Sequence, residues 1–167
     1  MNPDDVAVFR RARLLLLLDL LAEDTPAGVD AERIGVYDFL AAYPLLLVRG
    51  DDDPDRFTLL MAGFDDRAVA YSSAGPRLVT AQQHLARDLT ALVGMGLVAM
   101  AADGRIRYRP TSAGTAAAAS LTATYARSYV TAARIIVRRL RRLSGRRLRE
   151  VVRRCISVEP DHLKDFR

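Results

Sequence analysis

Arginine supplies most of the chemistry that this sequence offers. The stretch RIIVRRLRRLSGRRLREVVRR, residues 134–154, holds ten arginines and one acid, Glu150. Guanidinium groups bind phosphate bidentately and displace the counterions of nucleic acids, and they are also favoured in protein interfaces. The stretch therefore predicts a surface for nucleic-acid phosphates or for an acidic protein. Its arginines are Arg134, Arg138, Arg139, Arg141, Arg142, Arg146, Arg147, Arg149, Arg153 and Arg154.

Two plainer interpretations of these arginines stay open. A charged helix face is most often simply solvated, but surfaces that serve only solubility mix lysine, glutamate and arginine, whereas this one is almost pure arginine. A basic amphipathic helix can also lie on a membrane surface. That interpretation is disfavoured, because the apolar side of the stretch contains no tryptophan or phenylalanine.

The charge of the chain is divided unevenly. Residues 126–167 carry 13 basic and 4 acidic side chains, whereas residues 1–125 carry 12 basic and 16 acidic ones. A basic segment on an acidic body implies an acidic partner for that segment, and it argues against DNA binding over the whole surface. We therefore expect a body of residues 1–125 and an Arg-rich helical C-terminal extension of residues 126–167.

Signatures of catalysis and of metal binding are missing from the sequence. There is no phosphate-binding loop and no nucleophile elbow, and the only histidines, His84 and His162, have no cluster of cysteines near them. Cys155 falls on an apolar helical face and fits a small buried side chain. Turn and capping roles account for the acids of residues 51–55 and 65–66. We therefore predict a protein that is not an enzyme and that binds no metal or cofactor.

The cellular compartment follows from the same composition. A single cysteine cannot form a disulfide within the chain, which is typical of a reducing cytoplasm. The longest apolar run, residues 14–18, is far shorter than the ~20 residues that a membrane span needs. The N-terminus begins acidic and shows no signal-peptide cleavage site. The sequence predicts a cytoplasmic protein that does not partner a membrane.

Helical patterns cover most of the first sixty residues. Asn2 predicts the start of a helix over residues 3–23. This helix is apolar nearly all round, which suits either the middle of a core or an oligomer interface. Asp30 is the expected cap of a second helix over residues 31–43, and a short third helix is expected over residues 56–64.

The best-organised block is residues 79–114. Thr80 and Gln83 have the spacing of a capping box and predict a helix that begins there. Two strand-like runs then flank Asp103 and Gly104, the strongest short-range hairpin signal, and a further helix follows. Three helices, a hairpin and a helix follow the order of a winged helix-turn-helix. We therefore expect a mainly α fold with a small β-hairpin wing.

Both parts of this block offer groups for DNA. Arginines alternate along the second hairpin strand, so their side chains share one side of the wing, which suits a DNA backbone and equally an ordinary solvated hairpin face. On the candidate recognition helix before it, Gln83 and Arg87 are able to read adenine and guanine edges. Asp88 is expected beside them on the outward face, where it repels phosphate. The wing arginines are Arg105, Arg107 and Arg109.

Two basic amphipathic helices are expected in the C-terminal extension. Apolar residues from Ala133 to Leu143 line one side of the first helix, and Gly145 marks a break before the pattern resumes at Leu148. Each apolar side needs cover, either from the body or from a partner. The expected architecture is a winged helix-turn-helix body plus these C-terminal basic amphipathic helices.

Three stretches give the body a family resemblance: LLLLLDLLAE, VYDFLAAYPLLL and MAGFDDRAVAYSSAGPRLVTAQQHLARDLTALVGMGLV. Over about residues 10–110 the chain resembles the middle component of bacterial ABC-three-component systems, to which Lamassu-type anti-phage defence is similar. The resemblance implies a small winged-helix accessory subunit that accompanies an SMC- or Rad50-like ABC ATPase and a separate effector, often a nuclease. It supplies no catalytic residues, and it does not extend to the Arg-rich segment beyond about residue 126.

Charge pattern and resemblance together lead to one expected function. We expect a non-catalytic accessory subunit of an SMC/Rad50-like ATPase defence complex, in which the body mediates assembly. The basic helices contact the backbone of double-stranded DNA or an acidic patch of the ATPase. The alternative is a stand-alone winged-helix transcription regulator, and a third class is an interaction module without nucleic-acid contact. The sequence leaves open whether the chain forms a homo-oligomer.

Overall fold

The computed structural model describes residues 2–65 and 69–157 of the 167-residue chain, and it is mainly helical with a small antiparallel sheet. His162, Asp66 and the last ten residues of the expected extension lie outside the described residues. In chain order the elements are the 3-10 helix η1 (Pro3–Asp5), α1 (Ala7–Ala22), α2 (Ala31–Ala42), the 3-10 helix η2 (Pro44–Leu46), α3 (Pro54–Met61), α4 (Val69–Ser72), α5 (Ala74–Gly94), β1 (Val98–Asp103), β2 (Arg105–Pro110), α6 (Ser112–Ser120), α7 (Thr124–Leu140) and α8 (Gly145–Ser157).

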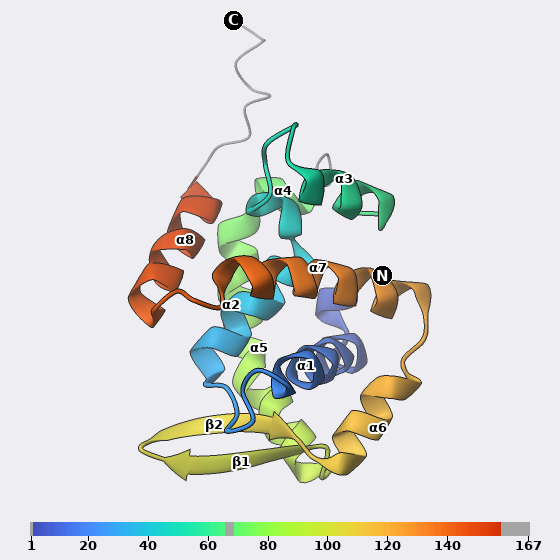
Figure 1. The fold of residues 1–167 in the computed structure, drawn as a ribbon, viewed down its shortest axis with the longest axis vertical. Coiled ribbons are helices and arrows are strands. Elements are labelled where there is room, and N and C mark those ends of the chain that lie inside the picture. Colours follow the sequence, from blue (N-terminus) through green and yellow to red (C-terminus); the bar gives the residue numbers. More distant parts are fainter. Residues whose placement is uncertain (1, 66–68, 158–167) are drawn as a thin grey trace, which may run out of the picture.

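Helix α1 lies in the middle of the molecule (Figure 1) and contacts α2, α5, α6, α7 and strand β2. The side chains of Leu14 to Leu18 and of Leu21 are all buried, because neighbouring elements cover the helix on nearly every side. Removing one leucine side chain from water contributes about 2 kcal/mol. The expected deep burial of this segment is confirmed, and its cover comes from within the chain.

The predicted cap residues Asn2 and Asp30 both accept a backbone hydrogen bond at a helix start, but Asn2 caps a different helix from the one predicted. The side chain of Asn2 accepts a hydrogen bond from the Asp4 N–H at 3.1 Å, but it caps η1, and α1 begins only at Ala7 after an extended Val6. The expected cap of α2 is confirmed, since the Asp30 side chain accepts from the backbone N–H of Arg33.

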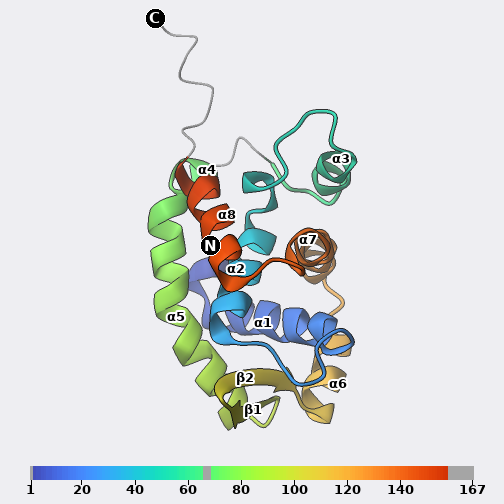
Figure 2. The ribbon, with the colours of Figure 1, turned by 60° about the vertical axis from the view of Figure 1, so that its left-hand side comes forward.

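Helix α5 begins earlier than the sequence predicts. It starts at Ala74, so Thr80 lies inside the helix, and its hydroxyl donates to the carbonyl of Pro76. The predicted capping box of Thr80 and Gln83 is therefore wrong: residues inside a helix have their N–H groups already paired with the preceding turn. With 21 residues, α5 is about 30 Å long and runs along one side of the molecule (Figure 2).

The predicted hairpin is confirmed. Strands β1 and β2 pair from Val98 opposite Pro110 to the tip at Gly104, whose φ of 73° is the left-handed conformation that glycine adopts most easily. Tyr108 of β2 also exchanges two backbone hydrogen bonds, of 2.9 and 2.8 Å, with Val29 in the segment between α1 and α2. This bridge fixes the hairpin to the helical body.

Helices α7 and α8 fold back on the body. Helix α7 packs against α1, α2 and α3, and α8 packs against α2 and α5, so the apolar sides of both helices are covered from within the chain. The expected boundary between residues 125 and 126 stays a prediction; α7 begins at Thr124. The buried side chains include Tyr129, Ala133 and Ile136 of α7 and Leu148, Val152 and Cys155 of α8.

A glycine in α6 allows this helix to approach the start of the hairpin. A Cβ atom at Gly114 would lie 1.9 Å from the carbonyl oxygen of Leu97. We expect Gly114→Ala to lower the free energy of unfolding by about 2 kcal/mol or more, because backbone has to move to make room. Urea titration measures this.

The matched control is Gly94→Ala at the end of α5, where a Cβ atom meets nothing within 4 Å. We expect this variant to match the unsubstituted chain or to exceed its stability slightly, because alanine favours helix more than glycine does. Equal free energies of unfolding for the two variants would contradict the close approach at Gly114.

Candidate functional site

The ten C-terminal arginines are all exposed, but two of them hold α3 in place. Arg139 contacts the carboxylates of both Asp53 and Asp55, with N–O distances of 2.6 and 2.7 Å, and Arg138 contacts Asp55 at 2.5 Å. Hydrogen bonds from Arg139 lower the pKa of Asp53, and hydrogen bonds from Arg138 and Arg139 lower that of Asp55. These two arginines join α7 to the start of α3, so they are less available to an external phosphate.

In the part of the chain that the structure describes, the other C-terminal arginines form either weak, exposed ion pairs or none, so they are more available to an external ligand than Arg138 and Arg139. Arg141 pairs with Asp24 at 3.3 Å and Arg149 pairs with Glu32 at 2.6 Å, but both pairs are about half exposed and are worth less than about 1 kcal/mol. A phosphate can therefore displace the acid. Six arginines form no ion pair among the described residues: Arg134, Arg142, Arg146, Arg147, Arg153 and Arg154.

The tip of the wing and the start of α8 line the same groove. The three wing arginines are exposed, as predicted, and none forms an ion pair in the described part of the chain. Arg105 and Ile106 at the hairpin tip line one side of a groove of about 590 Å³, and Arg146 and Arg149 line the other side. The groove is also lined by Asp30, Glu32 and Arg33 at the start of α2. One wing arginine, Arg105, thus shares a groove with two α8 arginines that lie about forty positions later in the sequence, whereas Arg107 and Arg109 are not among the residues that line it.

A second hollow extends this surface toward α5. It has a volume of about 310 Å³ and places Gln82 and Leu85 of α5 opposite Arg149 and Arg153 of α8. We define the basic surface as the face formed by the hairpin tip and α8. Its arginines are Arg105, Arg146, Arg149 and Arg153.

The candidate recognition residues Gln83 and Arg87 are both exposed on α5, but the expectation for Asp88 is wrong. Asp88 is 1% exposed and points to α1, where the Nε atoms of Arg10 and Arg11 lie 2.7 and 3.1 Å from its carboxylate oxygens. The two arginines neutralise Asp88 and hold it inside. Asp88 therefore places no negative charge beside Gln83 and Arg87.

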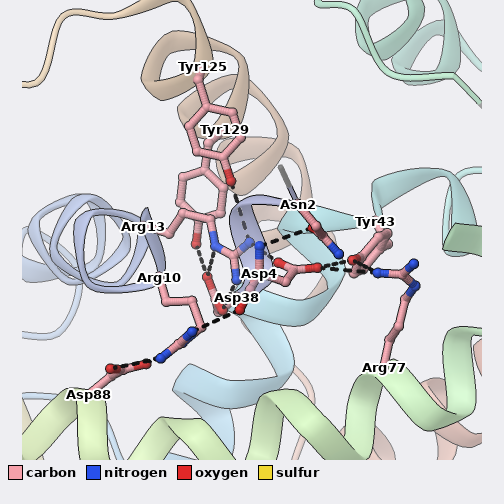
Figure 3. A network of polar contacts seen from close by, with 10 residues as sticks. All are labelled: Asn2, Asp4, Arg10, Arg13, Asp38, Tyr43, Arg77, Asp88, Tyr125 and Tyr129. Atoms are coloured by element: carbon pink, nitrogen blue, oxygen red, sulfur yellow. Dashed lines mark hydrogen bonds and ion pairs between the residues drawn. The ribbon is translucent and has the colours of Figure 1, made fainter. Parts of the chain in front are cut away.

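A cluster of buried charges, which the sequence analysis missed, surrounds Arg13 (Figure 3). Arg13 donates to Asp38 through Nε and Nη2, at 3.2 and 3.1 Å, and to Asp4 through Nη1. The Tyr129 hydroxyl donates to the same Asp38 at 2.8 Å. Burial and the negative charge of Asp38 raise the pKa of Tyr129 well above its ordinary value, so the hydroxyl remains a donor. These contacts tie η1, α2 and α7 to α1.

The cluster continues from Asp4 to Tyr43 and Arg77. The Tyr43 hydroxyl donates to Asp4, and Arg77 Nη1 lies 3.3 Å from the Tyr43 oxygen. Burial and the bond to Asp4 raise the pKa of Tyr43 to about 12. Burial by itself raises the pKa of Asp4, but the charge of Arg13 and the hydrogen bonds from Tyr43 and Arg13 outweigh it and hold that pKa below 3.8.

This charge cluster works as a structural link between elements. A cavity of about 310 Å³ adjoins it, lined in part by Arg10, Arg13 and Arg77, but each of these arginines already faces a carboxylate. In the described part of the chain no buried side-chain nitrogen or oxygen lacks a hydrogen-bond partner. The sequence signal that pointed here is FRRAR, three arginines that enter an otherwise apolar helix. A charge in such a helix has to be neutralised by other elements.

No protein-family model, curated protein or solved structure matches the chain. Within residues 2–65 and 69–157, no three histidine, cysteine or acidic side chains come together to hold a metal ion. None of the described helices is both long enough and apolar enough to cross a membrane. Function is therefore inferred from the arrangement of the arginines.

Asp88→Asn tests the link between α5 and α1. The substitution keeps the shape of the side chain but leaves the buried Arg10 without its counter-charge, which costs about 3 kcal/mol. We expect the free energy of unfolding at neutral pH to fall by about this amount in urea titration. Asp103→Asn, at the exposed hairpin tip, is the control and should change it by less than about 0.5 kcal/mol. Similar values for both variants would show that the Asp88 pair contributes little.

Asp4→Asn tests how the charge cluster responds to acid. Because the pKa of Asp4 is lower in the folded chain than its ordinary 3.8, ionised Asp4 stabilises the fold above that pH, and the stability is lost as the pH falls through the lowered pKa. We expect the variant to be less stable than the unsubstituted chain near pH 7, and the difference to shrink below about pH 4. Unfolding free energies measured between about pH 3 and pH 7 decide this. A difference that is constant over that range would exclude the electrostatic role.

Proposed function

We propose that this chain is a non-catalytic accessory subunit that contacts the backbone of double-stranded DNA within an SMC/Rad50-like ATPase complex of anti-phage defence. The basic surface is the observation that supports DNA contact. Arg105 from the wing and Arg146 and Arg153 from α8 line its grooves and form no ion pair within the described residues. Of the acids that line the same grooves, Asp30 caps α2 and Glu32 pairs with Arg149. Unpaired guanidinium groups on one face are what phosphate binding requires.

The body is, on this proposal, a winged helix-turn-helix with an insertion. Helices α2 and α5 are the helix-turn-helix pair, α3 and α4 are inserted between them, and β1 and β2 are the wing. The bridge between Val29 and Tyr108 supports the assignment, because it joins the wing to the segment between the first two helices. In this arrangement the wing and the recognition helix lie where a duplex is able to contact both.

The surface chemistry favours a duplex over a single strand. Proteins that hold single strands stack the bases on exposed aromatic rings. The exposed aromatic side chains in the described part are Phe57 of α3 and Tyr125 of α7, and neither lines the grooves of the basic surface. Arginines without aromatic rings beside them suit the regular phosphates of a duplex.

The ATPase partner is proposed from the family resemblance of about residues 10–110. Such an ATPase would supply the energy, the separate effector would supply the chemistry, and the complex would act in the cytoplasm. Copurification with an ATPase encoded beside this chain, when the two are expressed together, is the direct test of this part. If the chain neither copurifies with the ATPase nor binds DNA in its presence, the proposal is wrong.

A winged-helix transcription regulator is the second candidate, and the burial of Asp88 favours it. With that acid turned toward α1, Gln83 and Arg87 stand exposed on α5 without repulsion of phosphate by Asp88. Glutamine and arginine are side chains that read adenine and guanine. A regulator protects a discrete site upstream of its own operon, whereas the accessory subunit binds duplexes of any sequence.

Arg146→Gln with Arg153→Gln tests duplex contact through the basic surface. We expect the affinity for a random duplex to fall, and the slope of the logarithm of affinity against the logarithm of salt concentration to become less steep by about 2, because two phosphate contacts are lost. Fluorescence anisotropy over a salt series measures both quantities.

Arg134→Gln with Arg142→Gln is the matched control. It removes the same net charge from α7 and the turn that follows it, where neither residue lines the basic surface. We expect its salt slope to equal that of the unsubstituted chain. Equal slopes for both double variants would mean that net charge alone attracts the DNA. If none of the chains binds the duplex, the arginines would instead be assigned to contact with a protein partner.

A further inference from the structure

Helix α3 presents an apolar ridge to solvent. Phe57, Leu60 and Met61 are 68%, 43% and 73% exposed, and their spacing places them on one side of the helix. The opposite side is anchored: Leu59 is fully buried in a small core with residues of α7, and Asp55 is held by Arg138 and Arg139. The ridge is therefore held firmly while its large side chains stay in water.

An apolar hollow begins at the residue that follows the ridge. It has a volume of about 350 Å³ and is lined mainly by small and apolar groups of α2, of the segment after α3 and of the start of α7, with no charged residue. Its size fits one or two large side chains. Its lining residues are Ala41, Ala42, Ala62, Gly63, Phe64, Thr124, Tyr125, Ser128 and Tyr129.

Charges of opposite sign lie at the two ends of α3. Asp52 precedes the helix, is exposed and forms no ion pair within the described residues. At the other end, Ser128 of α7 donates to the carbonyl of Ala62, and Arg127 beside it is exposed without an acidic partner in the described part. When two copies of α3 lie antiparallel, Asp52 of each copy comes to the end of α3 at which Arg127 of the other copy lies. This complementarity favours a second copy over an occupant of uniform charge.

We infer that the apolar ridge and apolar hollow together form a two-fold homodimer interface, in which the ridge of each copy enters the hollow of the other. A contiguous patch of this kind usually marks an interface, and the adjoining ridge and hollow make it self-complementary. Figures 1 and 2 show α3 on the other side of the molecule from α8 and the hairpin. The dimer thus leaves both basic surfaces free, and it stands apart from the proposed DNA contact.

The test is the oligomeric state of the full chain as a function of concentration, measured by sedimentation equilibrium. We expect the unsubstituted chain to dimerise, and Phe57→Gln with Met61→Gln to weaken the dimer roughly tenfold or more, because two central apolar side chains are lost. Both positions are exposed, so the fold should not change. Val79→Gln with Met95→Gln, at exposed apolar positions on α5 and directly after its end, is the matched control and should leave the dimer intact.

A mixing experiment distinguishes the specific contact of ridge and hollow from nonspecific hydrophobic association. Ala62→Trp fills the hollow, and by itself this variant should dimerise as weakly as the ridge variant does. Mixed together, the intact ridge of one chain still fits the intact hollow of the other, so a heterodimer with one of the two contacts should form. A circular dichroism melt checks that each variant is folded.

Three results would overturn the inference. The first is an unsubstituted chain that stays monomeric up to about 100 µM, a concentration at which even weak dimers form. The second is a dimer that the ridge substitutions do not weaken. The third is a mixture of folded ridge and hollow variants that shows no heterodimer. Any of these would leave the ridge to a different protein, and none of them bears on DNA binding by α8 and the wing.

Discussion

The fold depends on the need to neutralise the arginines of a buried helix. Helix α1 carries Arg10 and Arg13 into the middle of the molecule, where they are 8% and 4% exposed. An unpaired charge at such a depth costs several kcal/mol, so the surrounding elements have to supply carboxylates in good geometry. They come from three directions: Asp88 from α5, Asp38 from α2 and Asp4 from η1. Apolar burial supplies the driving force, and these pairs determine which face each neighbouring helix turns inward.

The orientation of α5 is the consequence with the most bearing on function. Because Asp88 is drawn to Arg10 and Arg11, the helix turns Gln83 and Arg87 to solvent. Helix α7 is placed in the same way, since its Tyr129 donates to Asp38, and its position in turn sets where α8 begins. The buried cluster thus helps to place α8 beside the hairpin, although none of its residues lies on the basic surface.

The arginines of the C-terminal segment serve two purposes that their sequence does not separate. Arg138 and Arg139 hold α3 through Asp53 and Asp55, so they belong to the scaffold. Arg146 and Arg153 face outward on the basic surface and are left for a phosphate or an acidic partner. By holding α3, the first pair also supports the apolar ridge on the other side of the molecule. A single Arg-rich stretch therefore supports both proposed interfaces.

The sequence by itself determined the local structure. The hairpin about Gly104, the cap of Asp30 and the burial of the Leu14 to Leu18 run follow from turn geometry, hydrogen bonding and hydrophobicity over a few neighbouring residues. The start of α5 was missed, because Thr80 and Gln83 have cap spacing but the helix already extends through them from Ala74. Only the tertiary structure decided which charges pair. Asp88 and Arg10 are 78 positions apart in the sequence, and the wing and α8 are about forty positions apart. No local pattern relates side chains over such distances. Ion pairing acts through space, so the division of the arginines into buried, anchoring and free groups exists only once the helices are packed.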